Sequence, residues 1–457
     1  MAPASLYDVY IACACPPPRP ALDRILRENP AKLLDLVGSA PPINEQGRYL
    51  SWSEFKRRPL PEGFASHEEA WTFVRTARRA RAVALPFRDK TGAAFSVTEV
   101  GPLRNKLHQI DREAAGRLSA YGPIASHEET ERQHVASLIE EPYSSSSFEG
   151  AVTTRERAKE LIREGREPVS RDDRMVLNNH LAMEFIKEQR DAPLTPNLVL
   201  ELHDIVTRNT LDKPDAAGRL RTSDEEVAVW YEEELVHAPP PAETLEARLQ
   251  TLCDFANEDY QAADPFLNPI TRAIMLHFMI GYDHPFVDGN GRTARALFYW
   301  YALKQGYWLL EYVSISKVIR EESGKKYELA YLNAEHDGAD ATYFVLHQLD
   351  AILSGLAALR AYFESKAEEL DDIAAAIARL SQGKAVNPRQ AALLDQAARH
   401  PNRVFTVGAH QAANGVVYLT ARKDLENLVE RGWLQRAKAG RTVEYRAAEG
   451  LAALVGT

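Results

Sequence analysis

Two strongly apolar segments near the middle of this 457-residue chain are joined by a short glycine-containing turn, and this arrangement constrains the fold most. The first segment, ITRAIMLHFMIGY at 270–282, follows Asn268-Pro269, which is typical of a helix start. The second, TARALFYWYAL at 293–303, leads away from the turn. The surrounding segments from about 105 to 380 also carry apolar residues at i, i+3, i+4 spacing. The sequence therefore predicts a mainly α-helical core.

The turn between these segments, HPFVDGNGRTAR at 284–295, is suited to an anionic ligand. Gly289 and Gly291 permit positive φ and a close approach of a ligand to the backbone. The amides that follow can then point outward at a helix start, where anions bind. Arg292 and Arg295 lie three positions apart and share one helix face. Two guanidinium groups beside a nest of amides are what a polyphosphate requires.

Two further side chains in the turn could supply chemistry. Asp288 places a carboxylate beside the nest, where Mg²⁺ could bridge it to phosphates. His284 could accept a proton from an incoming hydroxyl group as a neutral imidazole. Read alone, a glycine-rich turn is usually just a turn and a single histidine usually packs or faces solvent. The combination of all these groups within twelve residues favours the functional interpretation.

The string HPFVDGNGRTAR resembles the Fic (filamentation induced by cAMP) family motif, HxFx(D/E)GNGRxxR, at every specified position, and the resemblance extends over roughly residues 105–370. It implies transfer of a nucleotide monophosphate, usually AMP from ATP, to a protein hydroxyl group. It implies that His284 deprotonates a Tyr, Ser or Thr of the target and that Asp288 binds Mg²⁺ (or Mn²⁺). The γ-phosphate would contact Arg295, and the phosphates would be held by Gly289, Asn290, Gly291 and Arg292. The intact GNGR sequence favours AMP over other transferred groups.

A second motif, SSSSFEGA at 144–151, is similar to the family's inhibitory motif (S/T)xxxE(G/N), with Ser145 and Glu149 at the specified positions. Its placement resembles the class whose inhibitory helix (about 144–151) precedes the core in the same chain. The resemblance implies that Glu149 pairs with Arg295 and removes the cation that aligns the γ-phosphate. In some relatives this glutamate also supports removal of AMP, so the direction of the reaction stays open. Without the resemblance, Glu149 reads as a solvated residue or a helix cap.

The segment around 220–240 alternates apolar and polar residues and predicts a β-hairpin. It resembles the family's flap, which implies that it holds the target segment by strand-like pairing beside the catalytic loop. Val227, Val229 and Val236 are candidate flap residues, although the buried face of the strands explains them equally well.

The segment KKYELAYLNAEHDGADATYF at 325–344 resembles the helix that lines the nucleotide base in the family. Tyr327 is the best candidate to stack on adenine, and Tyr331 and Asn333 are weaker ones. The sequence departs from the family's frequent Tyr-Tyr pair, because Lys326 occupies the first position. A tyrosine on a helix is also often a core residue.

The chain divides into three expected regions. Residues 1–104 contain proline-rich punctuation between short helical patterns and predict an α+β region. Residues 105–380 contain the Fic-type helical bundle with its inhibitory helix, flap and catalytic loop (284–295). Residues 386–449 have three short helical patterns and a terminal hairpin, which is typical of a winged helix-turn-helix domain.

The composition and net charge limit the classes of molecule that this protein is expected to bind. A net charge of -10 argues against a generally basic, nucleic-acid-coating protein. Residues 421–446 carry seven basic and four acidic side chains, so protein docking or homodimer contacts rank ahead of DNA binding. Three cysteines (Cys13, Cys15, Cys253), an N-terminus unlike a secretory signal and apolar runs too short to cross a membrane indicate a cytoplasmic protein without a membrane partner.

These observations support one main hypothesis and two alternatives. The main hypothesis is a self-inhibited protein adenylyltransferase that uses ATP and Mg²⁺ (or Mn²⁺) and acts on a target protein or on itself. The first alternative is a DNA-binding regulator in which the Fic core senses nucleotide. The second is transfer of another nucleotide monophosphate, from UTP, GTP or a different donor.

Overall fold

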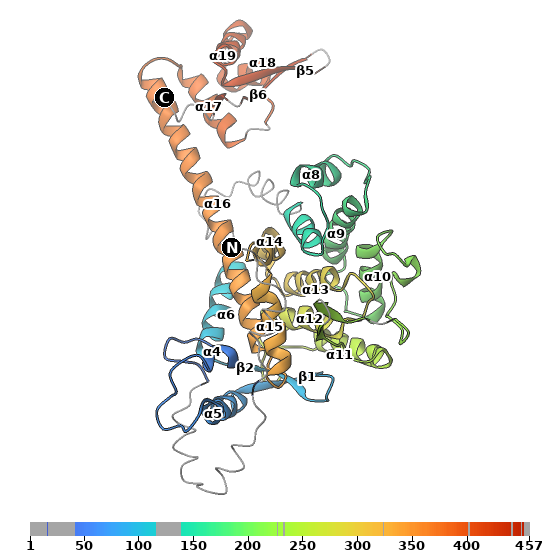
Figure 1. The fold of residues 1–457 in the computed structure, drawn as a ribbon. Coiled ribbons are helices and arrows are strands. Elements are labelled where there is room, and N and C mark those ends of the chain that lie inside the picture. Colours follow the sequence, from blue (N-terminus) through green and yellow to red (C-terminus); the bar gives the residue numbers. More distant parts are fainter. Residues whose placement is uncertain are drawn as a thin grey trace. The chain divides into compact units, whose positions relative to one another are not determined.

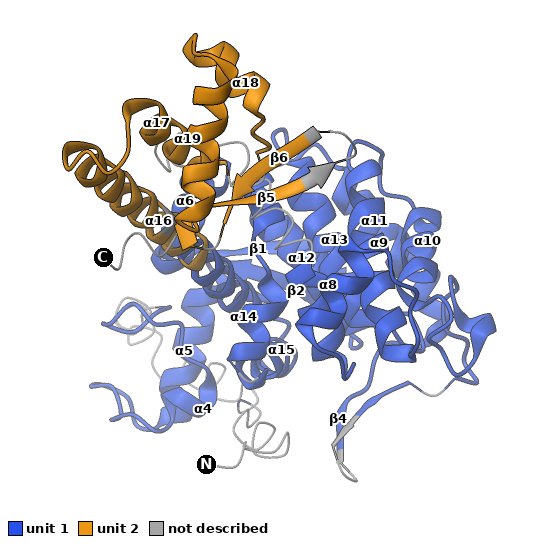
Figure 2. Ribbon diagram, turned by 90° about the horizontal axis from the view of Figure 1, so that it is seen from above, with its two compact units in different colours: residues 1–116, 134–357 blue, residues 117–133, 358–457 orange. Residues whose placement is uncertain are grey.

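The computed structural model describes residue 16 and residues 42–115, 139–225, 227–231, 234–322, 324–400, 403–439, 442–448 and 450–451. The chain forms two compact units (Figure 2): residues 1–116 with 134–357 make unit 1, and residues 117–133 with 358–457 make unit 2. The expectations for Cys13 and Cys15 lie outside the described residues.

The described N-terminal part of unit 1 combines helices with a small antiparallel sheet. Within this sheet, the backbone of Ser96 also exchanges hydrogen bonds with Ala339 and Ala341, at 3.0 and 2.9 Å. Unit 1 therefore includes residues on both sides of the boundary that the sequence suggests at residue 104. The elements are α4 (Trp52–Phe55), α5 (His67–Arg79), β1 (Ala82–Arg88), β2 (Ala94–Thr98) and α6 (Gly101–Ala114).

Helices make up most of the remainder of unit 1 (Figure 1), which confirms the prediction of a mainly helical core. Residues 139–148 are helical. The α-helices that follow are α8 (Arg155–Arg163), α9 (Arg171–Glu188), α10 (Pro196–Thr207), α11 (Leu245–Asn257), α12 (Pro269–Asp283), α13 (Asn290–Lys304), α14 (Ile315–Glu321) and α15 (Lys325–His336). Short 3₁₀ turns lie at η2 (Pro214–Ala216), η3 (Ala242–Thr244) and η4 (Trp308–Tyr312).

Helices α12 and α13 pack against each other and are buried on nearly all sides. The side chain of Asn268 caps α12 by accepting from the Ile270 amide, as its sequence predicts. Leu276 and Phe278 in α12 are fully buried. Each such side chain contributes about 1.5–3 kcal/mol to folding. The turn between the two helices therefore rests on the most firmly packed part of the unit.

The predicted hairpin is present but shorter than expected. Strands β3 (Val229–Tyr231) and β4 (Glu234–His237) pair antiparallel, with an irregularity between Val229 and Trp230. Figure 2 shows β4 extending away from the helices of unit 1.

In the described part of unit 2, the later part of α16 is followed by three shorter helices and an antiparallel hairpin, and these last four elements have the order that the sequence predicts. Leu394, Leu425, Leu428 and Tyr445 are buried at the centre of its hydrophobic core. The elements are the later part of α16 (Thr342–Gln382), then α17 (Pro388–Arg399), α18 (Val407–Asn414), α19 (Tyr418–Glu430), β5 (Leu434–Ala439) and β6 (Thr442–Ala447).

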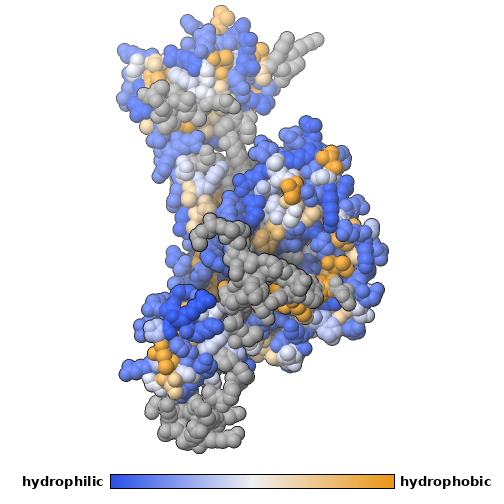
Figure 3. All heavy atoms as spheres, viewed as in Figure 1, coloured by the Kyte–Doolittle hydropathy of each residue, from blue (hydrophilic) through white to orange (hydrophobic). Residues whose placement is uncertain are grey.

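Helix α16 differs from the expectation that the apolar runs of this chain are too short to cross a membrane. Among the described residues it is a helix long and apolar enough to cross a membrane by length and composition. The sequence expectation considered only short unbroken apolar runs, and charged residues interrupt this helix. However, 61% of its most apolar stretch is buried inside the protein, as in the core helix of a globular domain. The face in Figure 3 is mostly hydrophilic, with hydrophobic residues in small scattered groups.

Candidate functional site

The turn predicted to bind phosphates begins where α12 ends. His284 adopts a left-handed conformation, with φ 43° and ψ 57°, and Gly289 precedes α13 with φ 84°. The Asn290 side chain closes the turn, because its Oδ1 accepts from the Phe286 amide (3.0 Å) and its Nδ2 donates to the Phe286 carbonyl (2.8 Å). Asn290 therefore offers a ligand its backbone amide, while its side chain holds the turn.

The orientation of His284 suits a general base. Its Nδ1 lies 2.9 Å from the Gly281 carbonyl, which can only accept, so Nδ1 carries the hydrogen. The neutral ring then has its lone pair on Nε2. Burial lowers the pKa of His284, although the bond to Gly281 opposes the shift. The imidazole is thus held in the neutral form that accepts a proton.

Asp288 lies at the edge of the nest with its side chain 43% exposed. Its Oδ1 accepts from the Gly289 amide (2.5 Å) and is 3.5 Å from Arg292 Nη2, while Oδ2 is 3.9 Å from Arg171 Nη2. Among the described residues, no group of three or more His, Cys, Asp or Glu side chains is placed to hold a metal. A single exposed carboxylate beside a phosphate site nonetheless fits Mg²⁺, which often takes one or two carboxylates and fills its shell with phosphate oxygens and water.

Arg292 lies beneath the nest and is almost completely buried. Its Nη1 donates to the Val206 carbonyl at 2.8 Å. Its Nε has no hydrogen-bond partner among the described residues. Burial lowers the pKa of Arg292, and the Asp288 charge opposes this. Leaving a donor on a buried cation unpaired costs free energy.

The structure brings the three residues of the predicted inhibitory contact together. Arg295 Nε donates to Ser145 Oγ at 2.8 Å, and its Nη2 lies 2.8 Å from Glu149 Oε1. Burial by itself would lower the pKa of Arg295, but Glu149 together with Tyr327 and Glu141 outweighs it, and the pKa is raised. The helical residues end at 148, so Glu149 projects from the turn after the helix rather than from within it. A Cβ built on Gly291 would lie 2.1 Å from Glu149 Oε1, so this carboxylate covers the nest directly.

Glu141, which the sequence analysis does not single out, anchors the same helical segment. Its buried carboxylate accepts from Ser314 Oγ (2.7 Å) and from the Ser316 amide (3.1 Å) at the start of α14. Burial raises the pKa of Glu141, and the bonds from Ser316 and Ser314 oppose that rise. Glu141 precedes the serine run and belongs to no motif, so the sequence provides no signal for this contact, which depends on the position of α14.

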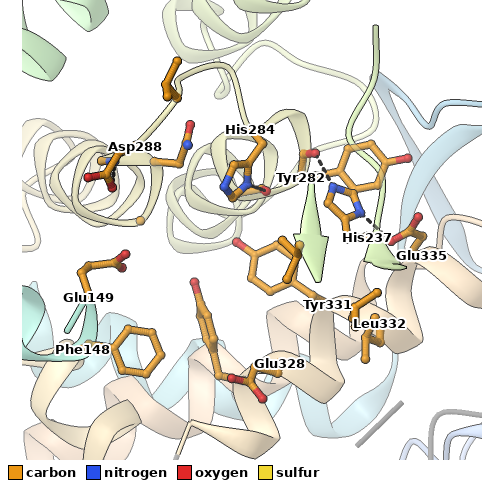
Figure 4. A pocket seen from close by; sticks show the side chains of 18 residues that line it. Phe148, Glu149, His237, Tyr282, His284, Asp288, Glu328, Tyr331, Leu332 and Glu335 are labelled. Atoms are coloured by element: carbon orange, nitrogen blue, oxygen red, sulfur yellow. Dashed lines mark hydrogen bonds and ion pairs between the residues drawn. The ribbon is translucent and has the colours of Figure 1, made fainter. Parts of the chain in front are cut away.

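A cavity of about 290 Å³ lies in front of the turn (Figure 4). Figure 4 shows Glu149 and Asp288 on one side of it and the His237–Glu335 pair on the other, with His284 between them. Of the predicted residues, Ser145, Val227, Arg292, Arg295 and Asn333 do not line this cavity. The predicted residues that do line it are Glu149, Val229, Val236, His284, Asp288, Gly289, Asn290, Gly291, Tyr327 and Tyr331.

Tyr327 lies in an aromatic cluster at the cavity wall. Its hydroxyl is hydrogen-bonded to His277 Nε2 at 2.9 Å, and burial raises the pKa of Tyr327 to about 12. Its ring meets Phe148 edge-on, with centroids 5.7 Å apart. Tyr331 packs next to it, with centroids 5.2 Å apart. Tyr327 therefore packs as a core residue and also lines the cavity. Its predicted contact with adenine stays a prediction.

The flap is attached to the cavity wall through His237 at the end of β4. Its Nε2 donates to the Tyr282 carbonyl and its Nδ1 lies next to Glu335 Oε2, both at 2.8 Å. Lys90 Nζ is 2.7 Å from the other Glu335 oxygen. Burial alone would raise the pKa of Glu335, but His237 and Lys90 outweigh it and lower it to about 2. The contacts of His237 with Tyr282 and Glu335 fix the flap at one end.

His203 in α10 is a further residue that sequence reasoning missed. Its Nε2 donates to the Asp288 carbonyl at 2.9 Å, and its Nδ1 accepts from the Gly218 amide at 3.0 Å. Its ring stacks on Phe286 with centroids 3.7 Å apart. Burial lowers the pKa of His203 to about 4. This neutral imidazole supports the turn from behind.

Comparison with known proteins finds a family match that includes this turn. The Fic/DOC family matches residues 193–302. Protein adenylyltransferase Fic of Drosophila willistoni is 30% identical over 134 residues, 29% of this chain and 24% of that protein. The protein of the same name from Nematostella vectensis is 34% identical over 110 residues, 24% and 23% of the two chains.

These matches span about a quarter of each relative's length. A crystal structure of a Fic family protein from Desulfovibrio desulfuricans is 22% identical, covers 77% of this chain and 97% of that one, and has a TM-score of 0.49. The family match includes the whole catalytic turn and most of α13. Residues 193–302 therefore match the Fic/DOC family, and this match fits a Fic domain protein.

Proposed function

We propose that this protein is a self-inhibited protein adenylyltransferase that transfers AMP from ATP to a Tyr, Ser or Thr hydroxyl group of a protein. The observation that carries the proposal is the ion pair of Glu149 with Arg295, held directly over Gly291. The carboxylate occupies the place where the amides and guanidinium groups would otherwise receive a polyphosphate. The relatives named protein adenylyltransferase match the same part of the chain.

In the active state, the amides of Gly289 to Arg292 and the two arginines would hold the phosphates of ATP. Asp288 would hold Mg²⁺ (or Mn²⁺), which neutralises phosphate charge when bound. Such transfers depend mainly on positioning and charge stabilisation. Every one of these groups comes from the turn or from the first two turns of α13, so they form one rigid cradle.

His284 would take the proton of the target hydroxyl on Nε2 as the hydroxyl oxygen forms its bond to the α-phosphorus. The bond from the α-phosphorus to the bridging oxygen breaks, and pyrophosphate leaves. The flap strands β3 and β4 border the cavity through Val229 and Val236, where a target segment could pair with their backbone.

Inhibition would follow from direct competition. While Glu149 neutralises Arg295, the γ-phosphate lacks the cation that aligns it, and the carboxylate repels the phosphates. Removal of Glu149 therefore restores both space and charge. Whether the same glutamate also supports removal of AMP from a modified target is decided by experiment, as is the identity of the transferred nucleotide.

Incubation of purified variants with radiolabelled ATP and Mg²⁺ tests this proposal. Glu149→Gly should label itself or lysate proteins at least tenfold faster than the wild-type protein, and adding His284→Ala to it should abolish labelling. Glu328→Gln is the matched control, because Glu328 lines the same cavity without pairing with Arg295, and it should not be activated.

Equal labelling by these proteins would contradict the assigned roles of both residues. Mass spectrometry of the product identifies the donor, because AMP, UMP and GMP add different masses. Incubation of the modified protein with Mg²⁺ and without ATP measures removal of AMP.

For unit 2 we propose a winged helix-turn-helix domain that docks proteins. Its order of three helices and a hairpin supports the fold. The start of α19 exposes Val417, Tyr418 and Leu419, an apolar surface unlike the basic helix start that contacts DNA phosphates. Full-length protein should therefore not shift duplex DNA at low salt, and a salt-sensitive shift would favour the DNA-binding alternative.

A further inference from the structure

The backbone of His284 needs external support. It is one of only four non-glycine residues with positive φ among the described parts of the chain. Such conformations persist where the surrounding structure holds them, and they cluster at functional sites. On its amino side, the His284 amide donates to the Ile280 carbonyl at 3.1 Å, which continues α12. On the carboxyl side of His284, α12 has ended, so a hydrogen-bond donor for the His284 carbonyl must come from another segment.

That support is Arg221, which is 7% exposed and lies between α10 and the flap. Its Nε donates to the His284 carbonyl at 2.8 Å, and its backbone amide donates to the Pro285 carbonyl at 2.9 Å. Its Nη2 donates to the Pro240 carbonyl at 2.5 Å. One residue thus binds two successive carbonyls of the catalytic turn and one at the far end of the flap.

We propose that Arg221 is a positioning residue that holds His284 in its left-handed conformation and ties both ends of the flap to the catalytic turn. The proposal deepens the proposed function and rests on it. Arg221 precedes β3 and Pro240 follows β4, so the fork of the guanidinium group joins the two ends of the hairpin. A target segment bound to the flap is thereby kept in a constant position relative to the His284 ring.

The two side-chain contacts of Arg221 depend on the fixed separation of the guanidinium donors Nε and Nη2, and not on the positive charge alone. The side-chain hydrogen bonds of Arg221 go to the carbonyl oxygens of His284 and Pro240, and no described carboxylate lies within ion-pair distance of it. A lysine has one ammonium group and cannot reproduce two donors fixed at this separation. Arg221 also lies outside the set of residues that line the cavity, so it does not contact a nucleotide there. Its loss should therefore affect turnover more than ATP binding.

The experiment compares Arg221→Gln and Arg221→Lys in the Glu149→Gly protein. Arg219→Gln is the matched control, because Arg219 is two positions earlier and contacts Glu225 and Asp215 instead of the turn. The readouts are kcat for AMP transfer, ATP affinity and stoichiometry by calorimetry, and hydrogen exchange of the amides in residues 284–288. We expect Arg221→Gln to lower kcat at least tenfold and speed exchange at least fivefold, with ATP affinity within threefold and unchanged stoichiometry. Arg221→Lys should be intermediate and Arg219→Gln should match the parent.

Unchanged kcat with unchanged exchange would overturn the proposal, whereas a fall in kcat matched by an equal fall in ATP stoichiometry would indicate that the variant is partly unfolded. If Arg221→Gln does not fold, Arg221→Lys carries the same comparison. If the Glu149→Gly parent transfers no nucleotide, the proposed function fails, and the exchange measurement still decides whether Arg221 holds the turn: faster exchange supports the role and unchanged exchange refutes it.

Discussion

Replacing Glu141 with alanine should activate the enzyme without changing any residue of the nucleotide cavity. The Glu141 side chain holds the segment that carries Glu149 against the start of α14, through Ser314 Oγ and the amide and hydroxyl of Ser316. Without it, the segment at 139–148 should detach more often, and Glu149 would leave Arg295 with it. This prediction tests the anchoring of the inhibitory segment by Glu141 separately from the ion pair of Glu149 with Arg295.

The size of the effect follows from the type of bond that is lost. Hydrogen bonds to a charged group contribute about 1.5–3 kcal/mol each. Burial of Glu141 opposes this gain, because burial raises the pKa of its carboxyl group. We therefore take the free energy of one such bond, not three, as the net contribution of Glu141 to holding residues 139–148 against the start of α14. At about 1.4 kcal/mol per factor of ten, the detached population should rise by roughly 10–150-fold.

The assay is the initial rate of AMP incorporation at saturating ATP. Glu141→Ala should be at least tenfold faster than the wild-type protein, up to the rate of Glu149→Gly, and the double variant should be no faster than Glu149→Gly. Glu140→Ala is the matched control, because Glu140 forms a partly exposed pair with Arg155 that contributes only about 0–1 kcal/mol. A folded Glu141→Ala protein with the wild-type rate would refute the reasoning, as would a double variant in which the two effects multiply.

Three further predictions follow from buried groups. In the proposed mechanism AMP transfer requires neutral His284, whose pKa is lowered by burial, so kcat/KM should fall on acidification only with a midpoint below 6.5; a midpoint above 6.5 would contradict the assignment. Arg78→Ala should lower the free energy of unfolding in urea by about 3–5 kcal/mol, since it removes a buried guanidinium group that donates to the Pro42 and Leu50 carbonyls and lies 3.8 Å from the Asp337 carboxylate. The exposed neighbour Arg79→Ala should change it by less than about 1 kcal/mol. Burial raises the pKa of Cys253 to about 12, so iodoacetamide at pH 8 should modify it in denatured but not in native protein, as measured by mass spectrometry; rapid modification of the native protein would show that the thiol is accessible.

Parts of the site were predictable because their chemistry is local. The glycines, Asp288 and His284 lie within one short turn, and helical spacing places Arg292 and Arg295 on one face. The contact of Glu149 with Arg295, 146 positions apart, was predicted only through the family resemblance. The predicted phosphate contact of Asn290 stays a prediction for its backbone amide, because its side-chain amide closes the turn.

The amino-acid sequence by itself determined the helical character of the core, the position of the cradle and the residue types that can hold phosphate, because hydrophobic spacing and turn chemistry act between near neighbours. Tertiary structure alone decided which residues support that cradle. His203, Arg221 and Glu141 act across 63 to 175 positions on backbone groups, or on the serines at the start of α14. Every residue has a backbone carbonyl and nearly every one an amide, so such partners leave no pattern in a sequence and are chosen only when packing brings distant segments together.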